Sequence, residues 1–217
     1  ITFTAKVIEK VAASQLISYL TASNLYDPMQ SAYRTHHSTE SALLKLQNDT
    51  LASFNERKAV FLVLLDLSAA FDTVDHDILL HRLEYRFGVS GSALKWFGSY
   101  LKGWTSSVNV MGVLSEPQTL EYGVPQGSVL GPVLFSVYLT PISNIILKYN
   151  LSYIVYADDI QIYASFDPSC QSDTQEKLDL ISKRLSELNT WMSSNFLKLN
   201  HTKTEFMMFY SVNCKIK

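Results

Sequence analysis

The chain has 217 residues, of which 47% are hydrophobic, 18% are charged and 12% are aromatic. This length suits one domain or two closely packed subdomains, and the hydrophobic fraction excludes an intrinsically disordered chain. With 18 basic and 20 acidic side chains the formal net charge is −2 at pH 7, which argues against a protein that holds nucleic acid by bulk positive charge.

Hydrophobic periodicity and turn residues predict helices and strands along the whole chain. Apolar residues at helical spacing predict a first helix over about 3–20, with Glu9 on its polar face, and Ser38 or Thr39 is a good cap for the second. All expected helices lie at about 3–20, 38–51, 75–87, 90–101, 129–148 and 178–192. The expected strands lie at 59–65, 106–110, 119–122, 151–156, 160–164 and 204–210. Antiparallel strands mixed with helices, without strict β-α alternation, predict an α+β fold.

Three further features concern the cellular setting. The longest apolar run, 59–65, is far shorter than the roughly 20 residues that a membrane span requires, so no membrane partner is expected. Cys170 and Cys214 cannot form a disulfide framework, which favours a reducing compartment. The chain begins at Ile1 without a signal pattern and ends directly after a predicted strand, so we expect a segment of a longer protein.

Three aspartates occupy unusual places among the predicted strands. Asp66 ends a fully apolar strand, and the adjacent pair Asp158 and Asp159 separates two other apolar strands. Aspartate is costly to bury unless a cation balances its charge, and a hard divalent ion such as Mg²⁺ prefers carboxylate oxygens. If the strands are neighbours, the three carboxylates converge and could hold two ions about 4 Å apart, as in phosphoryl transfer. The alternative is a helix cap at Asp66 and a plain hairpin turn at 158–159.

The segment 123–132 reads Gly-Val-Pro-Gln-Gly-Ser-Val-Leu-Gly-Pro. Its first two glycines, Gly123 and Gly127, make a loop in which backbone can approach a ligand closely. The loop leads into a predicted helix, whose amino end is expected to attract phosphate. It is not a P-loop, because Gly-Lys-Ser/Thr is missing, and an ordinary turn is the alternative.

Other polar residues give weaker signals. The five histidines show no metal-ligand spacing, so we expect them on the surface or as caps. Asp72, Asp75 and Asp77 fall where a helix is predicted to begin, an end that acidic residues favour, and are not expected to bind metal.

In order and spacing, three of these stretches resemble motifs A, B and C of reverse transcriptases, and the surrounding residues are similar to polymerases of non-long-terminal-repeat (LINE-like) retrotransposons. The motif-bearing stretches are Asp66-Leu-Ser-Ala-Ala-Phe-Asp72, Gly123-Val-Pro-Gln-Gly127 and Tyr156-Ala-Asp-Asp159. Gln30-Ser-Ala-Tyr-Arg34 with His37-Ser-Thr-Glu40 resembles the fingers motif of that family, and Leu197-Lys-Leu-Asn200 with Lys203-Thr204 resembles its motif D. The resemblance covers nearly the whole chain.

This resemblance implies a right-hand polymerase made of fingers and palm, with an antiparallel palm sheet packed on helices and the thumb absent. The reverse transcriptase domain would occupy 1–217. Within it, 1–58 would be mainly fingers, 59–101 palm with motif A, 102–127 a fingers hairpin with the motif B loop, and 128–217 palm with motifs C and D. Without thumb and upstream fingers, the chain alone is expected to polymerise weakly or not at all.

The resemblance also implies roles for the acidic and basic residues. Asp66 and Asp158 would bridge two Mg²⁺ ions, for which Mn²⁺ could substitute, and Asp159 would help hold the ion that activates the primer 3′-hydroxyl. Lys203 fits the general acid for the leaving pyrophosphate, or is a surface lysine. Arg34 would contact template or triphosphate, or is simply solvated.

Four more residues would contact the substrates. Phe71 matches the steric gate that rejects the 2′-hydroxyl of a ribonucleotide; the alternative is a core phenylalanine. Gln126 and Gly127 would pack against template and incoming nucleotide. Tyr156 would lie by the primer terminus or simply fill a strand position.

The function so implied is RNA-directed DNA polymerase, with RNA template, DNA primer and dNTPs as partners. A retroelement segment that acts as a non-catalytic nucleic-acid-binding module is the alternative, and a nucleotide cyclase would leave the Gly-Val-Pro-Gln-Gly loop unexplained. Two Mg²⁺ ions would change the formal net charge from −2 to +2, so the near-neutral composition does not exclude a polymerase. The resemblance implies a nuclear or cytoplasmic protein, and the sequence indicates no oligomeric state.

Overall fold

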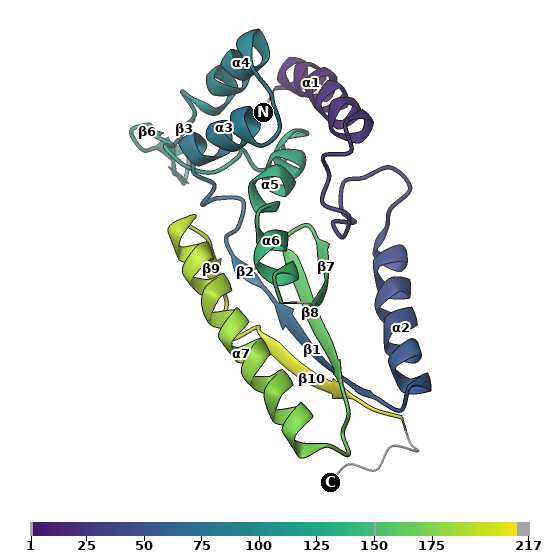
Figure 1. Ribbon diagram of the computed structural model, residues 1–217. Helices are drawn as coiled ribbons and strands as arrows, with labels where there is room; N and C mark the ends of the chain where they lie inside the picture. The colour runs from purple at the N-terminus through teal and green to yellow at the C-terminus, as the bar shows by residue number, and fades with distance from the viewer. Residues whose placement is uncertain (1, 150, 212–217) are drawn as a thin grey trace. The chain divides into compact units, whose positions relative to one another are not determined.

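The computed structural model describes residues 2–149 and 151–211. The chain forms two compact units, which Figure 1 traces in chain order. Unit 1 comprises residues 1–25 and 69–138, and unit 2 comprises residues 26–68 and 139–217. Each unit is therefore assembled from segments that are distant in sequence.

Unit 2 is built around a four-stranded antiparallel sheet with the strand order β10-β1-β8-β7. Its strands are β1 (Ala59–Leu65), β7 (Ser152–Tyr156), β8 (Asp159–Phe166) and β10 (Glu205–Phe209). Six of the seven residues of β1 are buried, which agrees with the prediction of a strand covered on both faces. A short second sheet pairs β2 (Leu67–Ser68) with β9 (Lys198–Leu199).

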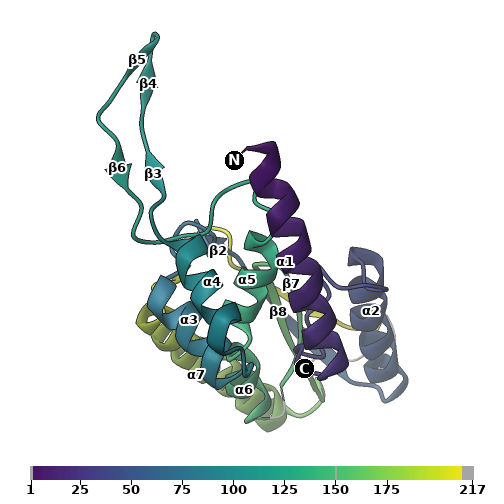
Figure 2. The ribbon, with the colours of Figure 1, turned by 90° about the horizontal axis from the view of Figure 1, so that it is seen from above.

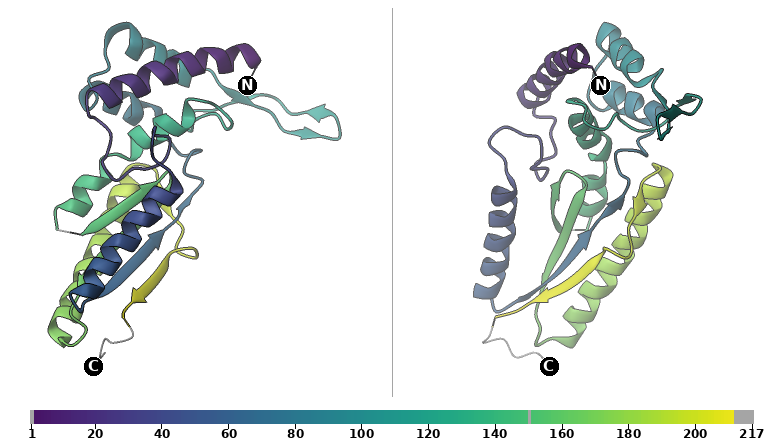
Figure 3. Two further views of the ribbon diagram at one scale, coloured as in Figure 1. Left: turned by 90° about the vertical axis from the view of Figure 1, so that its right-hand side faces the viewer. Right: turned by 180° about the vertical axis from the view of Figure 1, so that it is seen from behind.

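Two long helices, α2 (Thr39–Asn55) and α7 (Gln171–Ser194), cover opposite faces of the sheet of unit 2 (Figure 3). Ala42 of α2 packs with Val60, Leu62, Ile154 and Tyr163 in one buried cluster. The short helix α6 (Ile142–Leu147) packs on α7 and β7. Successive side chains of a strand point to opposite faces of the sheet, and Val60 and Leu62 of β1 lie on the face that packs against α2.

Unit 1 consists of helices and one β-hairpin. Its helices are α1 (Phe3–Ala22), α3 (His76–Tyr85), α4 (Gly91–Leu101) and α5 (Gly131–Leu139), whose last residue already belongs to unit 2. The hairpin contains β3 (Thr105–Ser106), β4 (Asn109–Val110), β5 (Val113–Leu114) and β6 (Gln118–Thr119). Figure 2 shows that this hairpin extends away from the helices of the unit.

The observed elements confirm the prediction of a mixed fold of helices and antiparallel strands. Two predictions were wrong. The strand expected at 119–122 ends at Thr119, because β6 pairs with β3 over only two residues. The apolar stretch after residue 128 forms two helices, α5 and α6, separated by Thr140 and Pro141. Proline has no N–H to continue a helical ladder, which accounts for the break. The pairing of β2 with β9 was missed, since two-residue strands leave no periodic signal. Cys214 lies outside the described residues. Among the described helices, none has the length and hydropathy needed to cross a bilayer.

Candidate polymerase site

The end of strand β1 brings Asp66 to the turn of the β7–β8 hairpin in unit 2. The register of β1 with β8 ends at the pair of Leu65 and Ile160, so Asp66 follows beside Asp159. Tyr156 pairs with Asp159 and closes the hairpin, which leaves a two-residue turn of Ala157 and Asp158. The strand thus begins at Asp159, one residue earlier than expected, and all three predicted carboxylates lie at one end of the sheet.

The charges of these aspartates interact. Partial desolvation raises the pKa of the Asp159 carboxyl, and the negative charges of Asp158 and Asp66 raise this pKa further. The ammonium group of Lys203 acts in the opposite direction, and its Nζ lies 3.7 Å from Oδ2 of Asp66. The backbone N–H of Asn200 donates to the carbonyl oxygen of Asp66 over 2.9 Å. The β9 turn is thereby tied to the end of β1, which brings Lys203 to the carboxylates.

The fit of a metal ion depends on how closely the carboxylates approach one another. Across residues 2–149 and 151–211, no three His, Cys, Asp or Glu side chains form a group that could hold a metal ion. The donors are nevertheless hard oxygen ligands of the kind that Mg²⁺ prefers, and their mutual repulsion is the kind that a cation relieves. The chemistry of the donor set therefore fits Mg²⁺, and its binding here remains a proposal.

Arg34 and Tyr156 also belong to unit 2. The Arg34 guanidinium donates from Nη1 to the carbonyl oxygens of Asp27 (2.9 Å) and Gln30 (3.0 Å), and it lies 4.8 Å from the centre of the Tyr26 ring. Arg34 is therefore not simply solvated, since part of its guanidinium orders the 27–34 segment. Tyr156 is half-buried at the end of β7.

In unit 1, the loop from Gly123 to Gly127 packs against residues 71–74, at the end of motif A. The N–H of Gly123 donates to the carbonyl of Val74 over 2.8 Å, and the N–H of Val124 donates to that of Phe71 over 2.9 Å. Gly123 has φ +88°, and a Cβ there would lie only 2.9 Å from the carbonyl oxygen of Asp72. Glycine is required at this position because any side chain would collide with backbone.

Side chains hold the same loop. The Gln126 amide donates to the two carboxylate oxygens of Asp72 over 3.1 and 3.3 Å. His76 is buried, and its Nε2 donates to the carbonyl oxygen of Gly123 over 2.7 Å. The expectation that all histidines are surface or capping residues was wrong for His76. Asp75 does cap a helix as expected, accepting from the Ile78 N–H over 2.8 Å.

The substrate-facing candidates in unit 1 differ in how much of their surface is free. Gly127 has φ +75°, and a Cβ added there would meet no described atom within 4 Å, so the backbone of the loop is accessible at this point. Phe71 is half-buried, and its ring centre lies 4.7 Å from that of the buried Phe135. One side of the Phe71 ring is thus fixed by packing while another remains exposed.

The amino end of α5 is occupied by a carboxylate of the protein itself. Oε2 of Glu9 accepts from the N–H groups of Val129 (2.7 Å) and Leu130 (3.4 Å), and Oγ of Ser128 accepts from the Gly131 N–H (2.7 Å). Glu9 is only 2% exposed, although the sequence pattern put it on the polar face of its helix. The expectation that this helix end attracts phosphate was therefore wrong, because the carboxylate of Glu9 already binds the free N–H groups at the start of α5 and interacts with the helix dipole.

Replacing Glu9 with alanine should destabilise the protein by about 1–3 kcal/mol, because the N–H groups of Val129 and the buried Leu130 lose their acceptor. Urea denaturation followed by circular dichroism measures this free energy of unfolding. Glu84→Ala on the exposed side of α3 is the matched control and should change stability by less than about 0.5 kcal/mol. Equal stabilities of the two variants would contradict the role of Glu9.

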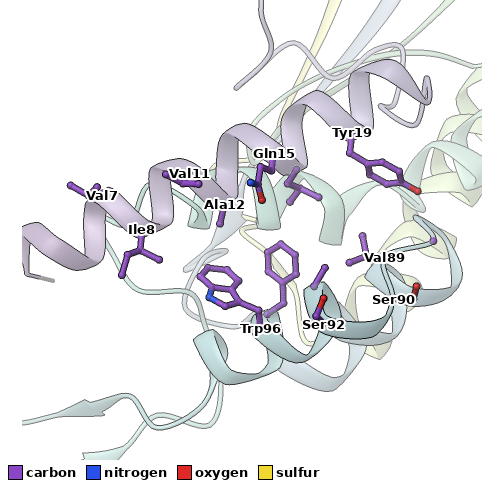
Figure 4. Close-up of a pocket in the computed structure, with 14 residues that line it drawn as sticks. Val7, Ile8, Val11, Ala12, Gln15, Tyr19, Val89, Ser90, Ser92 and Trp96 are labelled. Atoms are coloured by element: carbon purple, nitrogen blue, oxygen red, sulfur yellow. The ribbon is translucent and has the colours of Figure 1, made fainter.

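An apolar cavity of about 780 Å³ lies between α1 and α4 in unit 1 (Figure 4). Val7, Val11, Tyr19, Val89 and Trp96 are among its lining residues. None of the residues predicted from the motifs lines it, so it is separate from the candidate polymerase site.

Known proteins are similar to the chain in sequence or in fold. The family model of reverse transcriptase (RNA-dependent DNA polymerase) matches residues 1–216. A probable RNA-directed DNA polymerase from transposon BS of Drosophila melanogaster is 29% identical over 92% of the chain and 22% of its own length. The RNA-directed DNA polymerase from mobile element jockey of Drosophila funebris is 25% identical over 94% of the chain and 22% of its own length. The chain thus spans about a fifth of these relatives.

Solved structures of telomerase have the same fold as this chain. One of them is telomerase from Candida albicans in complex with the TWJ fragment of telomeric RNA. The match has a TM-score of 0.70 and 13% sequence identity, and it covers 98% of this chain and 36% of the telomerase chain. Another is apo telomerase from Candida tropicalis, truncated from the C-terminal domain. This match has a TM-score of 0.65 and 14% sequence identity, and it covers 96% of this chain and 41% of the telomerase chain. The family model covers nearly every residue, including all three motifs, and the chain belongs to the reverse transcriptase (RNA-dependent DNA polymerase) family.

Proposed function

We propose that this chain carries the nucleotidyl-transfer site of an RNA-directed DNA polymerase, which adds deoxynucleotides to a primer 3′-hydroxyl on an RNA template. The observation that carries the proposal is the meeting of Asp66 with the Asp158–Asp159 turn at one end of the sheet of unit 2. The chain belongs to the reverse transcriptase family, which supports nucleotidyl transfer as the reaction at this cluster. In this proposal the sheet of unit 2 is the palm, and the hairpin with the following loop in 102–127 belongs to the fingers.

Asp66, Asp158 and Asp159 would hold two Mg²⁺ ions, which Mn²⁺ could replace. Bound there, the ions would lower the pKa of the primer hydroxyl and neutralise charge on the pyrophosphate. Lys203 would donate a proton from Nζ to the leaving pyrophosphate. Its position 3.7 Å from Oδ2 of Asp66 supports this role, as does its exposure, which leaves the ammonium group free to reach a ligand.

The remaining residues would select and orient the substrates. Gln126 and Gly127 would pack on template and incoming nucleotide, and Phe71 would reject the ribose 2′-hydroxyl. Arg34 would contact template or triphosphate with the part of its guanidinium that the loop does not use, and Tyr156 would lie by the primer terminus. The relatives named as RNA-directed DNA polymerases support RNA as the class of template.

A single-turnover primer-extension assay tests this function, with the protein in excess over a DNA primer annealed to an RNA template. Extension should require Mg²⁺ and dNTPs and should stop with EDTA, because the carboxylates alone cannot activate the hydroxyl. The rate is expected to be low for the 217-residue chain. Binding of primer–template without any metal-dependent extension, by a protein lengthened at both ends of this chain, would contradict the proposal and favour a non-catalytic binding module.

A further inference from the structure

The turn that carries Asp158 has a strained backbone. Tyr156 and Asp159 are the closing pair of a two-residue hairpin, and Ala157, the first residue of its turn, has φ +58°. Glycine is the residue usually found at such a position, because a Cβ disfavours positive φ. A conformation of this kind persists only where the surrounding structure holds it, so contacts of Ala157 must supply the restraint.

The side chain of Gln30 makes such contacts on both sides of Ala157. Oε1 of Gln30 accepts from the backbone N–H of Ala157 over 3.2 Å and from that of Ala32 over 2.9 Å. Nε2 of Gln30 donates to the carbonyl oxygen of Ala157 over 3.4 Å. Gln30 is only 4% exposed, so water does not replace these bonds readily. The side-chain amide of Gln30 therefore forms hydrogen bonds with both the N–H and the carbonyl oxygen of the strained residue.

The backbone around Gln30 is itself fixed to the same hairpin. The N–H of Val155 donates to the carbonyl of Met29 over 3.0 Å, and the N–H of Ser31 donates to the carbonyl of Val155 over 2.9 Å. These bonds form a parallel bridge between Gln30 and Val155. The amide of Gln30 thus reaches the turn from a backbone with a set position beside strand β7.

We propose that Gln30 is a positioning residue, which holds the Ala157–Asp158 turn in the shape that directs the Asp158 and Asp159 carboxylates. The inference deepens the proposed function and rests on it only where activity is concerned. Glutamine suits the task because its amide offers both the acceptor and the donor that the peptide groups of Ala157 need. Glutamate would lose the donor and add a buried charge beside two aspartates.

The first measurement follows the turn itself in the metal-free protein. Gln30→Met keeps the length of the side chain and removes its hydrogen bonds, so the Ala157 amide should exchange with solvent at least about fivefold faster. Exchange is read by NMR at the Ala157 amide. This readout needs neither metal nor activity.

Tyr153→Phe is the matched control for this measurement. The Tyr153 hydroxyl donates to Oδ1 of Asp27 over 2.8 Å, so it ties the same segment to the same strand without touching the turn. Its loss should leave the exchange of the Ala157 amide within about twofold of wild type. An unchanged exchange rate of the Ala157 amide in Gln30→Met would overturn the proposal. An equal increase in Tyr153→Phe would also overturn it, because any contact that ties the segment around Gln30 to strand β7 would then have the same effect on the turn.

The second measurement is kinetic. A displaced pair of carboxylates should lower kcat for primer extension by about 100-fold, with the KM for primer–template within about twofold. Ala157→Gly relieves the strain, so adding it to Gln30→Met should recover at least about tenfold in kcat. A KM effect without a kcat effect, or no recovery, would overturn positioning of the turn. If a wild-type protein lengthened at both ends of this chain did not extend primers, the proposed function would fail, and the exchange measurement would still decide the role of Gln30.

Discussion

Asp159→Asn is expected to lower the rate of primer extension by at least about 1,000-fold while making the metal-free protein slightly more stable. Asparagine has the same shape but lacks the charge that would hold a divalent ion, and each factor of ten in rate corresponds to about 1.4 kcal/mol of barrier. Single-turnover extension with wild type and variant at equal concentration measures the loss.

The expected gain in stability comes from the electrostatics of the folded protein. Burial and the charges of Asp158 and Asp66 raise the pKa of Asp159, so the folded state binds this proton more tightly than the unfolded state. The contribution of Asp159 to stability is therefore greatest at low pH and falls as the pH rises through the range between the ordinary and the raised pKa. Solvent screens a carboxyl this exposed, so we expect a rise of only about 1 °C in Tm at pH 7.

Thermal melts in EDTA at pH 7 and near pH 4 measure this gain, which should shrink at the lower pH because wild-type Asp159 carries less negative charge there. Asp179→Asn on α7 replaces an exposed aspartate of the same unit and should change neither extension nor Tm. Extension at the wild-type rate by Asp159→Asn would contradict the assignment of the metal site. A fall in its Tm would contradict the repulsion among the three carboxylates.

The sequence could predict those parts of the fold and site that depend on local patterns. The apolar run of β1 ends in Asp66, and Asp158 and Asp159 interrupt a hairpin, so each anomaly is visible within a few residues. Register then brings them together, because an antiparallel pair that matches Leu65 with Ile160 leaves Asp66 no other neighbour on β8 than Asp159.

The contacts that support the site could not be predicted, because they join residues far apart in sequence. Glu9 lies 120 residues before Val129, whose N–H donates to its carboxylate, and Gln30 lies 127 residues before Ala157. Glu9 lies among the polar positions of an amphipathic helix. Hydrophobic periodicity does not reveal that the N–H groups at the start of another helix need an acceptor and that Glu9 becomes buried by providing it. The buried His76 likewise finds an acceptor for its ring N–H at the carbonyl oxygen of Gly123, 47 residues further along the chain.

Phe71→Ala separates the two functions that the sequence left open for this ring. If Phe71 is a steric gate, the preference of the polymerase for dNTPs over rNTPs should fall by about 100-fold, because the space for a 2′-hydroxyl opens. Competition between the two nucleotides in the primer-extension assay measures this ratio. The exposed part of the ring makes contact with a sugar feasible, and the packing of Phe71 on Phe135 over 4.7 Å would keep the ring in place.

If Phe71 is only a core residue, the same variant should lose stability without losing selectivity. Some destabilisation, about 1–2 kcal/mol, is expected in either case from the lost ring contact and burial, so stability alone does not decide. Phe87→Leu provides the control, because Phe87 is buried in the same unit and lies outside the motifs. It should lower stability and keep the preference for dNTPs. A gate also requires a graded response, in which Phe71→Leu retains more selectivity than Phe71→Ala, since rejection of the hydroxyl depends on the volume that remains.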